Sequence, residues 1–231
     1  MMMVNKKSVA TERAFKRFIQ SQNYPCVGAK SALAKGNIQI MTANKLAHSA
    51  DDLAIYEHLV RQAAEYSRSG RIFQSLVILF NDDKWRSEKD FESVLWKRLQ
   101  ALSDIDKNQG YEHDQRVSSD PSDPNFAVSF AGTAFFVLGL HPNASRPARR
   151  FDYPAIIFNI HDQFEQMRST GLYEQLQETI SERDIALAGN RNPMLALHGS
   201  VSAARQYSGR AVESDWACPY QRNKEMISDD I

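Results

Sequence analysis

Five apolar runs recur along the chain and predict the strands of one sheet. They cover residues 38–41, 76–80, 126–130, 134–140 and 154–159. The run at 76–80 has no polar position, which is typical of a central strand that is covered on both faces. Gly132 stands between the third and fourth runs, so these two runs predict a hairpin.

Between these runs, apolar residues recur at the three- and four-residue spacing of amphipathic helices. Helices are predicted over 10–20, 51–66, 88–101 and 173–188, with a shorter helix through Phe164 that Gly171 ends. Leu53 is expected on the inner face of the second helix and Ile185 on that of the last. Asp162 precedes Glu165 by three residues, which predicts a capping box at the start of the short helix.

Two segments interrupt this alternation. Residues 103–125 are polar and rich in turn formers, and we interpret them as a long ordered loop or a lid. The chain after Gly189 is irregular. Because helices and strands are interleaved, the predicted fold class is α/β (or α+β), with a mixed β-sheet flanked by helices and an irregular C-terminal segment. We expect one domain over residues 1–231, with residues 1–7 disordered.

Charge and cysteine content narrow the classes of function. The chain has 231 residues with 28 basic and 28 acidic side chains, so there is no electrostatic case for a nucleic-acid or anionic membrane partner. No apolar run approaches the roughly 20 residues of a membrane span, and no apolar core follows the N-terminal lysines as in a signal peptide. Cys26 and Cys218 do not make a disulfide framework. We therefore expect a reduced, cytoplasmic protein.

The run at 134–140 leads into a segment with candidate chemistry. His141 follows the run directly, and Arg146, Arg149 and Arg150 come soon after it. An imidazole can bind a metal or carry a proton, and guanidinium groups bind carboxylates or phosphate. One metal ligand beside several anion-binding groups suits a haem with its propionates. The alternative is a surface turn, stopped by proline, whose arginines are solvated.

A second candidate lies where the run at 154–159 meets the short helix. Ligands of α/β folds gather at the carboxyl edge of the sheet, and Asn159 and His161 stand at this junction. Capping explains Asp162 but neither of these two residues. His141 and His161 are the histidines that follow apolar runs, which by itself is a weak metal signal. The chain has no HExxH motif and no paired CxxC, so zinc has no support.

Two further segments admit both a structural and a functional interpretation. Residues 25–31 look like a phosphate loop, but the glycine spacing fails. A tight turn with Cys26 buried is the structural interpretation, and Lys30 facing a ligand anion is the functional one. Tyr207 and Arg210 lie in the irregular C-terminal part. The functional interpretation is that they line the entrance to a substrate site, and the structural one is that this segment is solvated and wraps around the domain. Cys218 is either a thiolate ligand of iron or a buried structural thiol.

Several of these segments together resemble the YqcI/YcgG family. The similar stretches are residues 24–32, 130–132, 135–142, 145–146 and 218–220. Residues 158–165, 192–195 and 206–210 resemble more closely the branch of that family that contains the guanitoxin-pathway haem-dependent N-hydroxylase. The resemblance runs from about residue 24 to residue 220, which is nearly the whole chain.

This resemblance implies a haem b protein that uses O2 and an external electron donor to hydroxylate a guanidino nitrogen of arginine or an arginine-derived amino acid. Under it, His141 is expected to ligate the iron, with His161 as the alternative, and His161 and Asn159 are expected to be catalytic. The expected haem-binding residues are Lys30, Ser145, Arg146, Arg149, Arg150, Tyr207 and Arg210. The expected substrate-binding residues are Asp162, Gln163 and Glu165.

Two other functions stay open at this point. One is a haem-binding sensor or carrier without turnover, and the other is a cofactor-free α/β binding module in which both histidines are structural. The expected partners are a small guanidino compound and an electron donor, with neither nucleic acid nor membrane. A homodimer is a candidate assembly.

Overall fold

The computed structural model describes residues 6–81, 87–195 and 199–222. Its sheet has five strands, which confirms the five predicted from apolar runs. They are β1 (Ile38–Ala43), β2 (Ser75–Phe80), β3 (Val128–Phe130), β4 (Thr133–Leu140) and β5 (Ala155–Ile160). Their order is β1-β2-β5-β4-β3. The β1–β2 pair is parallel and the other pairs are antiparallel, so the sheet is mixed.

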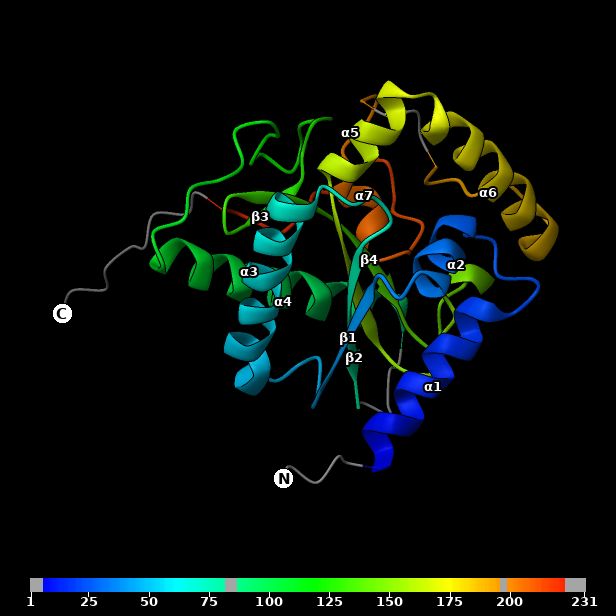
Figure 1. Cartoon of the computed structure of the whole chain (residues 1–231), viewed down its shortest axis with the longest axis horizontal. Helices are drawn as coiled ribbons and strands as arrows, with labels where there is room; N and C mark the ends of the chain where they lie inside the picture. Colours follow the sequence, from blue (N-terminus) through cyan, green and yellow to red (C-terminus); the bar gives the residue numbers. More distant parts are fainter. Residues whose placement is uncertain (1–5, 82–86, 196–198, 223–231) are drawn as a thin grey trace.

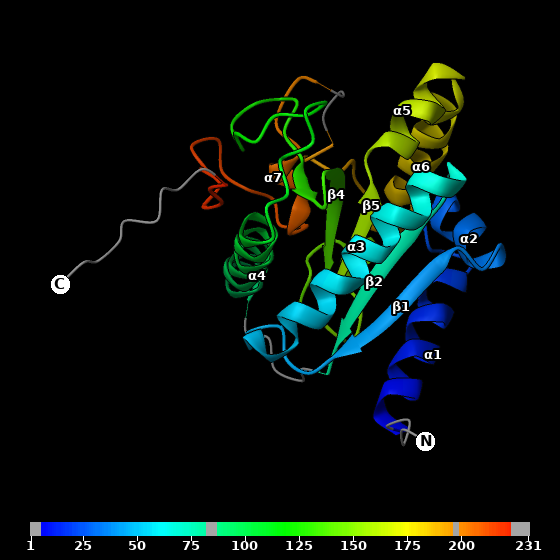
Figure 2. The ribbon, with the colours of Figure 1, turned by 60° about the vertical axis from the view of Figure 1, so that its left-hand side comes forward.

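Helices cover both faces of this sheet (Figures 1 and 2). Helices α1 (Lys6–Gln20) and α2 (Val27–Ala34) lie on one face, and α3 (Asp52–Ser69) and α4 (Glu88–Asn108) lie on the other. Helices α5 (Asp162–Ser169) and α6 (Leu172–Ala188) follow β5, and α6 packs against α2. The remaining elements are the short helix α7 (Ala204–Tyr207) and the 3-10 turns η1 (Ser49–Asp51) and η2 (Pro147–Arg149). The predicted fold class is confirmed. Within the described residues, no helix has the length and apolarity needed to cross a membrane.

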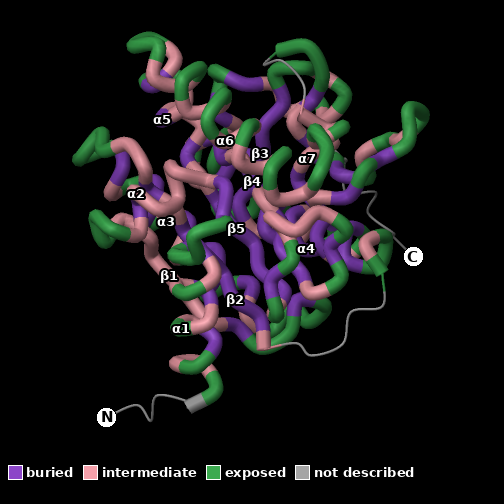
Figure 3. Tube along the Cα trace, turned by 90° about the vertical axis from the view of Figure 1, so that its right-hand side faces the viewer, coloured by how far each residue is buried: buried purple, intermediate pink, exposed green. Residues whose placement is uncertain are grey.

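Strand alternation divides the apolar side chains between two faces. In β2, Leu76, Ile78 and Phe80 pack with α3 and α4, whereas Val77 and Leu79 pack with α1. The strands in the middle of the molecule are buried over most of their length (Figure 3). This arrangement explains why the run at 76–80 contains no polar residue.

The hairpin of β3 and β4 turns at Ala131 and Gly132. Their φ angles are 50° and 68°, and both lie in the left-handed region. Two successive residues of this kind are the requirement of a type I′ turn, which matches the twist of the flanking strands. The predicted hairpin around Gly132 is confirmed.

Helix α4 continues two turns beyond its predicted end, so residues 103–108 are not part of a loop. The polar residues of these turns point inward and are paired. The Asp106 carboxylate accepts from Arg222 Nη2 at 2.9 Å, and the Ser103 hydroxyl accepts from Tyr220 Oη at 2.9 Å. Because the partners lie more than 100 residues away, the polarity of this stretch suggested a loop when considered locally. The prediction of an ordered loop or lid now applies to the irregular segment that follows α4.

Two expectations about helix faces are wrong, and one about the N-terminus is only partly tested. Leu53 is 65% exposed because the inner face of α3 runs through Ile55, Tyr56 and Leu59. Ile185 is 39% exposed, since a neighbouring stripe of α6 faces inward. Of residues 1–7, which we expected to be disordered, positions 1–5 lie outside the described residues and the last two begin α1.

Candidate functional site

A cavity of about 330 Å³ lies on the face of the sheet that carries α1, α2 and α6. This volume is within the range of roughly 300–1,000 Å³ for small-molecule and cofactor pockets. The strands contribute alternate residues, among them Phe136, Leu138 and Leu140 of β4, and Ile157 and Asn159 of β5. Most of the wall is apolar, which suits a ligand with a large apolar body.

Helix α6 forms one side of this cavity with a single stripe of side chains. The stripe consists of Tyr173, Leu176, Gln177, Ile180, Ser181 and Asp184, at the spacing of one helical face. No residue of α6 is fully buried, although the helix packs against α2 and η2. The inner face of α6 therefore lines the cavity instead of packing against the sheet.

Cys26 lines the cavity at the start of α2. It is the N-cap residue, and its Sγ accepts a hydrogen bond from the Ala29 amide at 3.3 Å. Burial raises the pKa of the thiol. The predicted tight turn at 25–31 is thus a capped helix, and Lys30 points away from the cavity to donate to the carbonyls of Ser21 and Gln22.

Arg149 is a cation in the cavity wall that is not paired with any carboxylate among the described residues. Its guanidinium donates to the carbonyls of Gly139 at 3.1 Å and Gln206 at 3.4 Å. Burial lowers the pKa of this guanidinium. Arg149 is partly buried, and a partly buried guanidinium without a counter-ion can interact favourably with an anionic group of a ligand.

The other residues expected to bind the propionates have protein partners. Arg146 lines the cavity, but its Nε and Nη2 donate to Asp184 Oδ2 at 2.9 and 2.5 Å. Arg150 donates to the carbonyls of Ala144 and Ser145, and the Ser145 hydroxyl donates to Glu88. These contacts hold the 141–150 loop itself. The arginines therefore do not act as one anion clamp, and Arg149 is the member that faces the cavity without a carboxylate.

His141 is fully buried but does not line the cavity. It continues the alternation of β4 on the side of Phe135 and Val137, opposite to Leu138 and Leu140. Its ring stacks on Phe91 with centroids 4.4 Å apart, and neither ring nitrogen has a hydrogen-bond partner among the described residues. Burial lowers the pKa of His141 to about 4, so the imidazole is neutral near pH 7.

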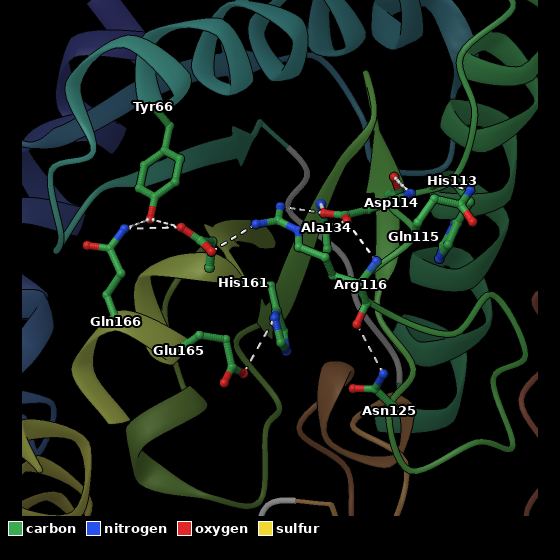
Figure 4. A network of polar contacts seen from close by, with 12 residues as sticks. Tyr66, His113, Asp114, Gln115, Arg116, Asn125, Ala134, His161, Glu165 and Gln166 are labelled. Atoms are coloured by element: carbon green, nitrogen blue, oxygen red, sulfur yellow. Dashed lines mark hydrogen bonds and ion pairs between the residues drawn. The ribbon is translucent and has the colours of Figure 1, made fainter. Parts of the chain in front are cut away.

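A polar network that includes Tyr66, Arg116 and Asp114 lies beside the cavity (Figure 4), and Asp162, expected near the substrate, belongs to it. The Asp162 carboxylate accepts from Tyr66 Oη at 2.7 Å and from Arg116 Nη1 at 2.8 Å. Arg116 also binds Asp114 with Nε at 2.9 Å and Nη2 at 2.7 Å. Asp162 is the first helical residue, and His161 holds the N-cap position without a side-chain cap. The predicted capping box is therefore wrong, because Asp162 is used in tertiary contacts.

Asn159, Gln163 and His161 occupy different parts of this region. The Asn159 and Gln163 side chains line the cavity, where Asn159 Oδ1 accepts from Ser75 Oγ at 2.6 Å. The Gln163 amide is bonded to the backbone of Gln74 at 3.0 Å in both directions. His161 lies outside the cavity, with Nδ1 3.8 Å from Glu165 Oε1.

Shared walls connect the cavity to the polar network. A vestibule of about 100 Å³ has Phe136 and Phe164 in common with the cavity. A polar cleft of about 270 Å³, lined by Asp114, Arg116, Asp162 and Glu165, has Asn125 and His161 in common with the vestibule. The apolar cavity, the vestibule and the polar cleft thus form a series, with His161 between the last two.

The C-terminal candidates are structural. Tyr207 is fully buried in the apolar core on the α4 face, where its hydroxyl donates to the Phe135 carbonyl at 3.2 Å. Arg210 forms ion pairs with Glu92 and Glu213, each at 2.8 Å. Cys218 is half-buried beside Trp216 in a separate groove, and burial raises its pKa to about 12. None of these three residues lines the cavity.

The sequence analysis identified the cavity only in part. It considered Cys26 as a buried thiol in a turn and gave no role to α6 beyond packing. The feature that could have indicated a role for Cys26 is its position immediately before an eight-residue helix. The described residues contain no group of three or more histidine, cysteine, aspartate or glutamate side chains arranged to hold a metal ion.

Comparison with known proteins gives one match. The family model described as the YqcI/YcgG family matches residues 15–221, which include every residue that lines the cavity, the vestibule and the cleft. No curated protein matches the chain, and no solved structure matches it.

Proposed function

The chain belongs to the YqcI/YcgG family, and on that premise we propose that it is a haem-dependent monooxygenase that hydroxylates a guanidino nitrogen of arginine or an arginine-derived amino acid. The motifs at 158–165, 192–195 and 206–210 support this branch of the family. Segments 192–195 and 206–209 both contribute residues to the cavity wall, including Asn192, Met194 and Gln206.

The observation that carries the proposal is the chemistry of the cavity wall. A haem needs apolar surfaces for its macrocycle, a cation for its propionates and a donor atom for its iron. The apolar stripe of α6 and the facing strand residues meet the first need, and Arg149 meets the second. Cys26 supplies a donor atom in the same wall. His141, the ligand favoured from sequence, lies on the other face of the sheet.

When bound, haem supplies the reductive activation of dioxygen. Phe136 and Phe164 line both the cavity and the vestibule, so their apolar rings disfavour water at the boundary between the two. Their rings meet edge to face at 5.9 Å. Asn159 presents an amide to the cavity, and His161 presents an imidazole that can hold or release a proton at the boundary of the vestibule.

The polar cleft supplies recognition of a guanidinium group. The Arg116 guanidinium is already held there by the carboxylates of Asp114 and Asp162, in the planar geometry that suits a guanidinium. Asp162 lines this cleft next to His161, so a substrate guanidinium that enters the cleft lies near this carboxylate. The carboxylates of the cleft thus support the proposed substrate class, and the apolar cavity supports the proposed haem.

The test is the ultraviolet–visible spectrum of the protein, purified after expression with a haem precursor. We expect a Soret band, a shift of the ferric spectrum on addition of arginine, and a product that contains one added oxygen atom when a reductant and dioxygen are supplied. In Asp162→Asn the Soret band should remain and the arginine-induced shift should weaken. Asp104→Asn, on an exposed face of α4, is the matched control. A colourless protein contradicts the proposal, and a Soret band without substrate response or product indicates a sensor or carrier.

A further inference from the structure

The donor atoms near the cavity can be compared one by one. Among the described histidines and cysteines, Cys26 is the residue that lines the cavity. His141 faces α4 on the opposite side of the sheet, His161 lies at the vestibule, and Cys218 lies in a separate groove. Tyr24, Met167, Tyr173 and Met194 also line the cavity, and Cys26 is the side chain among these that can bind iron as a thiolate.

We propose that Cys26 Sγ is the axial iron ligand, so that the protein holds its haem as a thiolate complex. This inference rests on the proposed haem-dependent function and specifies its metal site. On coordination, the sulfur forms a bond to ferric iron with its own electron pair, the thiol proton leaves to solvent, and no electron is transferred.

Two groups around Cys26 favour a negative charge on its sulfur, although burial opposes that charge. The sulfur caps the N-terminus of α2 and accepts the Ala29 N–H, and the positive end of a helix favours negative charge. Arg149 is close enough for its charge to lower the thiol pKa, although desolvation is larger and raises it. The free thiol is accordingly protonated, and a coordinated metal deprotonates a thiol outright. Amide hydrogen bonds to the sulfur also tune the reduction potential of the iron.

Two features of the wall other than the cysteine indicate a large ligand with an anionic group. The first is the stripe of α6, whose apolar members Leu176 and Ile180 face the cavity. The second is the partly buried Arg149, whose described hydrogen bonds go to carbonyl oxygens and not to a carboxylate. A haem, with its apolar macrocycle and the propionates at one edge, fits both features. Cys26 lies in the same wall and would supply the ligand for the iron.

The proposal predicts the class of ligand seen by spectroscopy in the wild-type protein. A thiolate ligand gives a ferrous–CO Soret band well to the red of that of an imidazole complex, and a narrow spread of g values in the electron paramagnetic resonance spectrum of low-spin ferric iron. These measurements need no variant, so they do not depend on whether a substitution folds. We expect both signatures in the loaded protein. An imidazole-type spectrum overturns the assignment of Cys26.

Variants then locate the ligand. Cys26→Ser should lose the thiolate signature and bind haem at least roughly ten-fold more weakly, with an unchanged circular dichroism spectrum. Cys218→Ser is the matched control and should behave as wild type, and His141→Gln should keep the thiolate signature. Loss of the signature in His141→Gln or Cys218→Ser, or its retention in Cys26→Ser, overturns the proposal. Haem binding with an imidazole-type spectrum leaves the proposed function standing, whereas failure of wild type to bind haem removes both.

Discussion

The two faces of the sheet are built differently, although the same strands supply both. On the α3 and α4 face, aromatic rings such as Phe91, Trp96 and Tyr207 fill the space above the strands. On the other face, α6 stands over a cavity of about 330 Å³. A closely packed face stabilises the fold, whereas a face with a lined cavity provides room for a ligand.

Charged groups follow the same division. On the filled face, buried charges are paired, as in Arg222 with Asp106 and Arg210 with Glu92. On the cavity face, Arg149 donates to carbonyls and has no carboxylate partner among the described residues. The comparison teaches that the two faces treat their cations differently: the filled face pairs them with carboxylates, whereas Arg149 on the cavity face is held by backbone carbonyls.

The largest expected effect concerns these charges. Asp106→Ala leaves Arg222 buried without its partner and should lower the free energy of unfolding by about 3–5 kcal/mol. Arg149→Met keeps the length of the side chain and removes an unpaired charge, so the free protein should be at least as stable as wild type. Urea denaturation measures both values. If Arg149→Met proves as destabilising as Asp106→Ala, the two faces do not differ in the way described.

A smaller effect is expected from pH, through His141 on the filled face. Burial lowers its pKa from the ordinary 6.5 to about 4. At pH values between these two, His141 is protonated in the unfolded chain but neutral in the folded chain. The stability of the haem-free protein should therefore fall as pH drops from 7 to 4, by roughly 3 kcal/mol from this residue.

The measurement is urea denaturation at several pH values, with His141→Gln as the comparison. The part of the pH dependence due to His141 should disappear in this variant, because glutamine does not titrate. An identical pH dependence in wild type and variant would mean that the imidazole is not buried in its neutral form.

The smallest expected effect on stability sharpens the contrast in packing. Leu99→Phe, at a fully buried position of α4, should cost about 1–3 kcal/mol because the space is already filled. Ile180→Phe, on the cavity stripe of α6, should change stability by less than about 1 kcal/mol because the ring can enter the cavity. Thermal unfolding and haem titration test this pair: Ile180→Phe should lose haem binding, and Leu99→Phe should retain it. Equal destabilisation by the two variants would show that the cavity does not accommodate the ring.

Much of the fold was predictable because local patterns agree with it. The apolar runs predicted all five strands, and Gly132 predicted the hairpin. The end of α4 was missed because Ser103 and Asp106 find partners near the C-terminal end of the described chain. The capping box was wrong because Asp162 binds Tyr66 and Arg116 instead. Both errors concern polar side chains whose partners are distant in sequence.

The sequence by itself determined which segments are strands and helices, since the spacing of apolar residues is a local property. It also determined that a histidine and three arginines follow β4. It could not determine which face of the sheet each of them joins, because strands that are apolar on both sides give no sign of which side is packed and which lines a cavity. Only the tertiary structure placed Cys26 and Arg149 in one wall and His141 on the other side of the sheet, since that placement depends on where α6 and α4 dock.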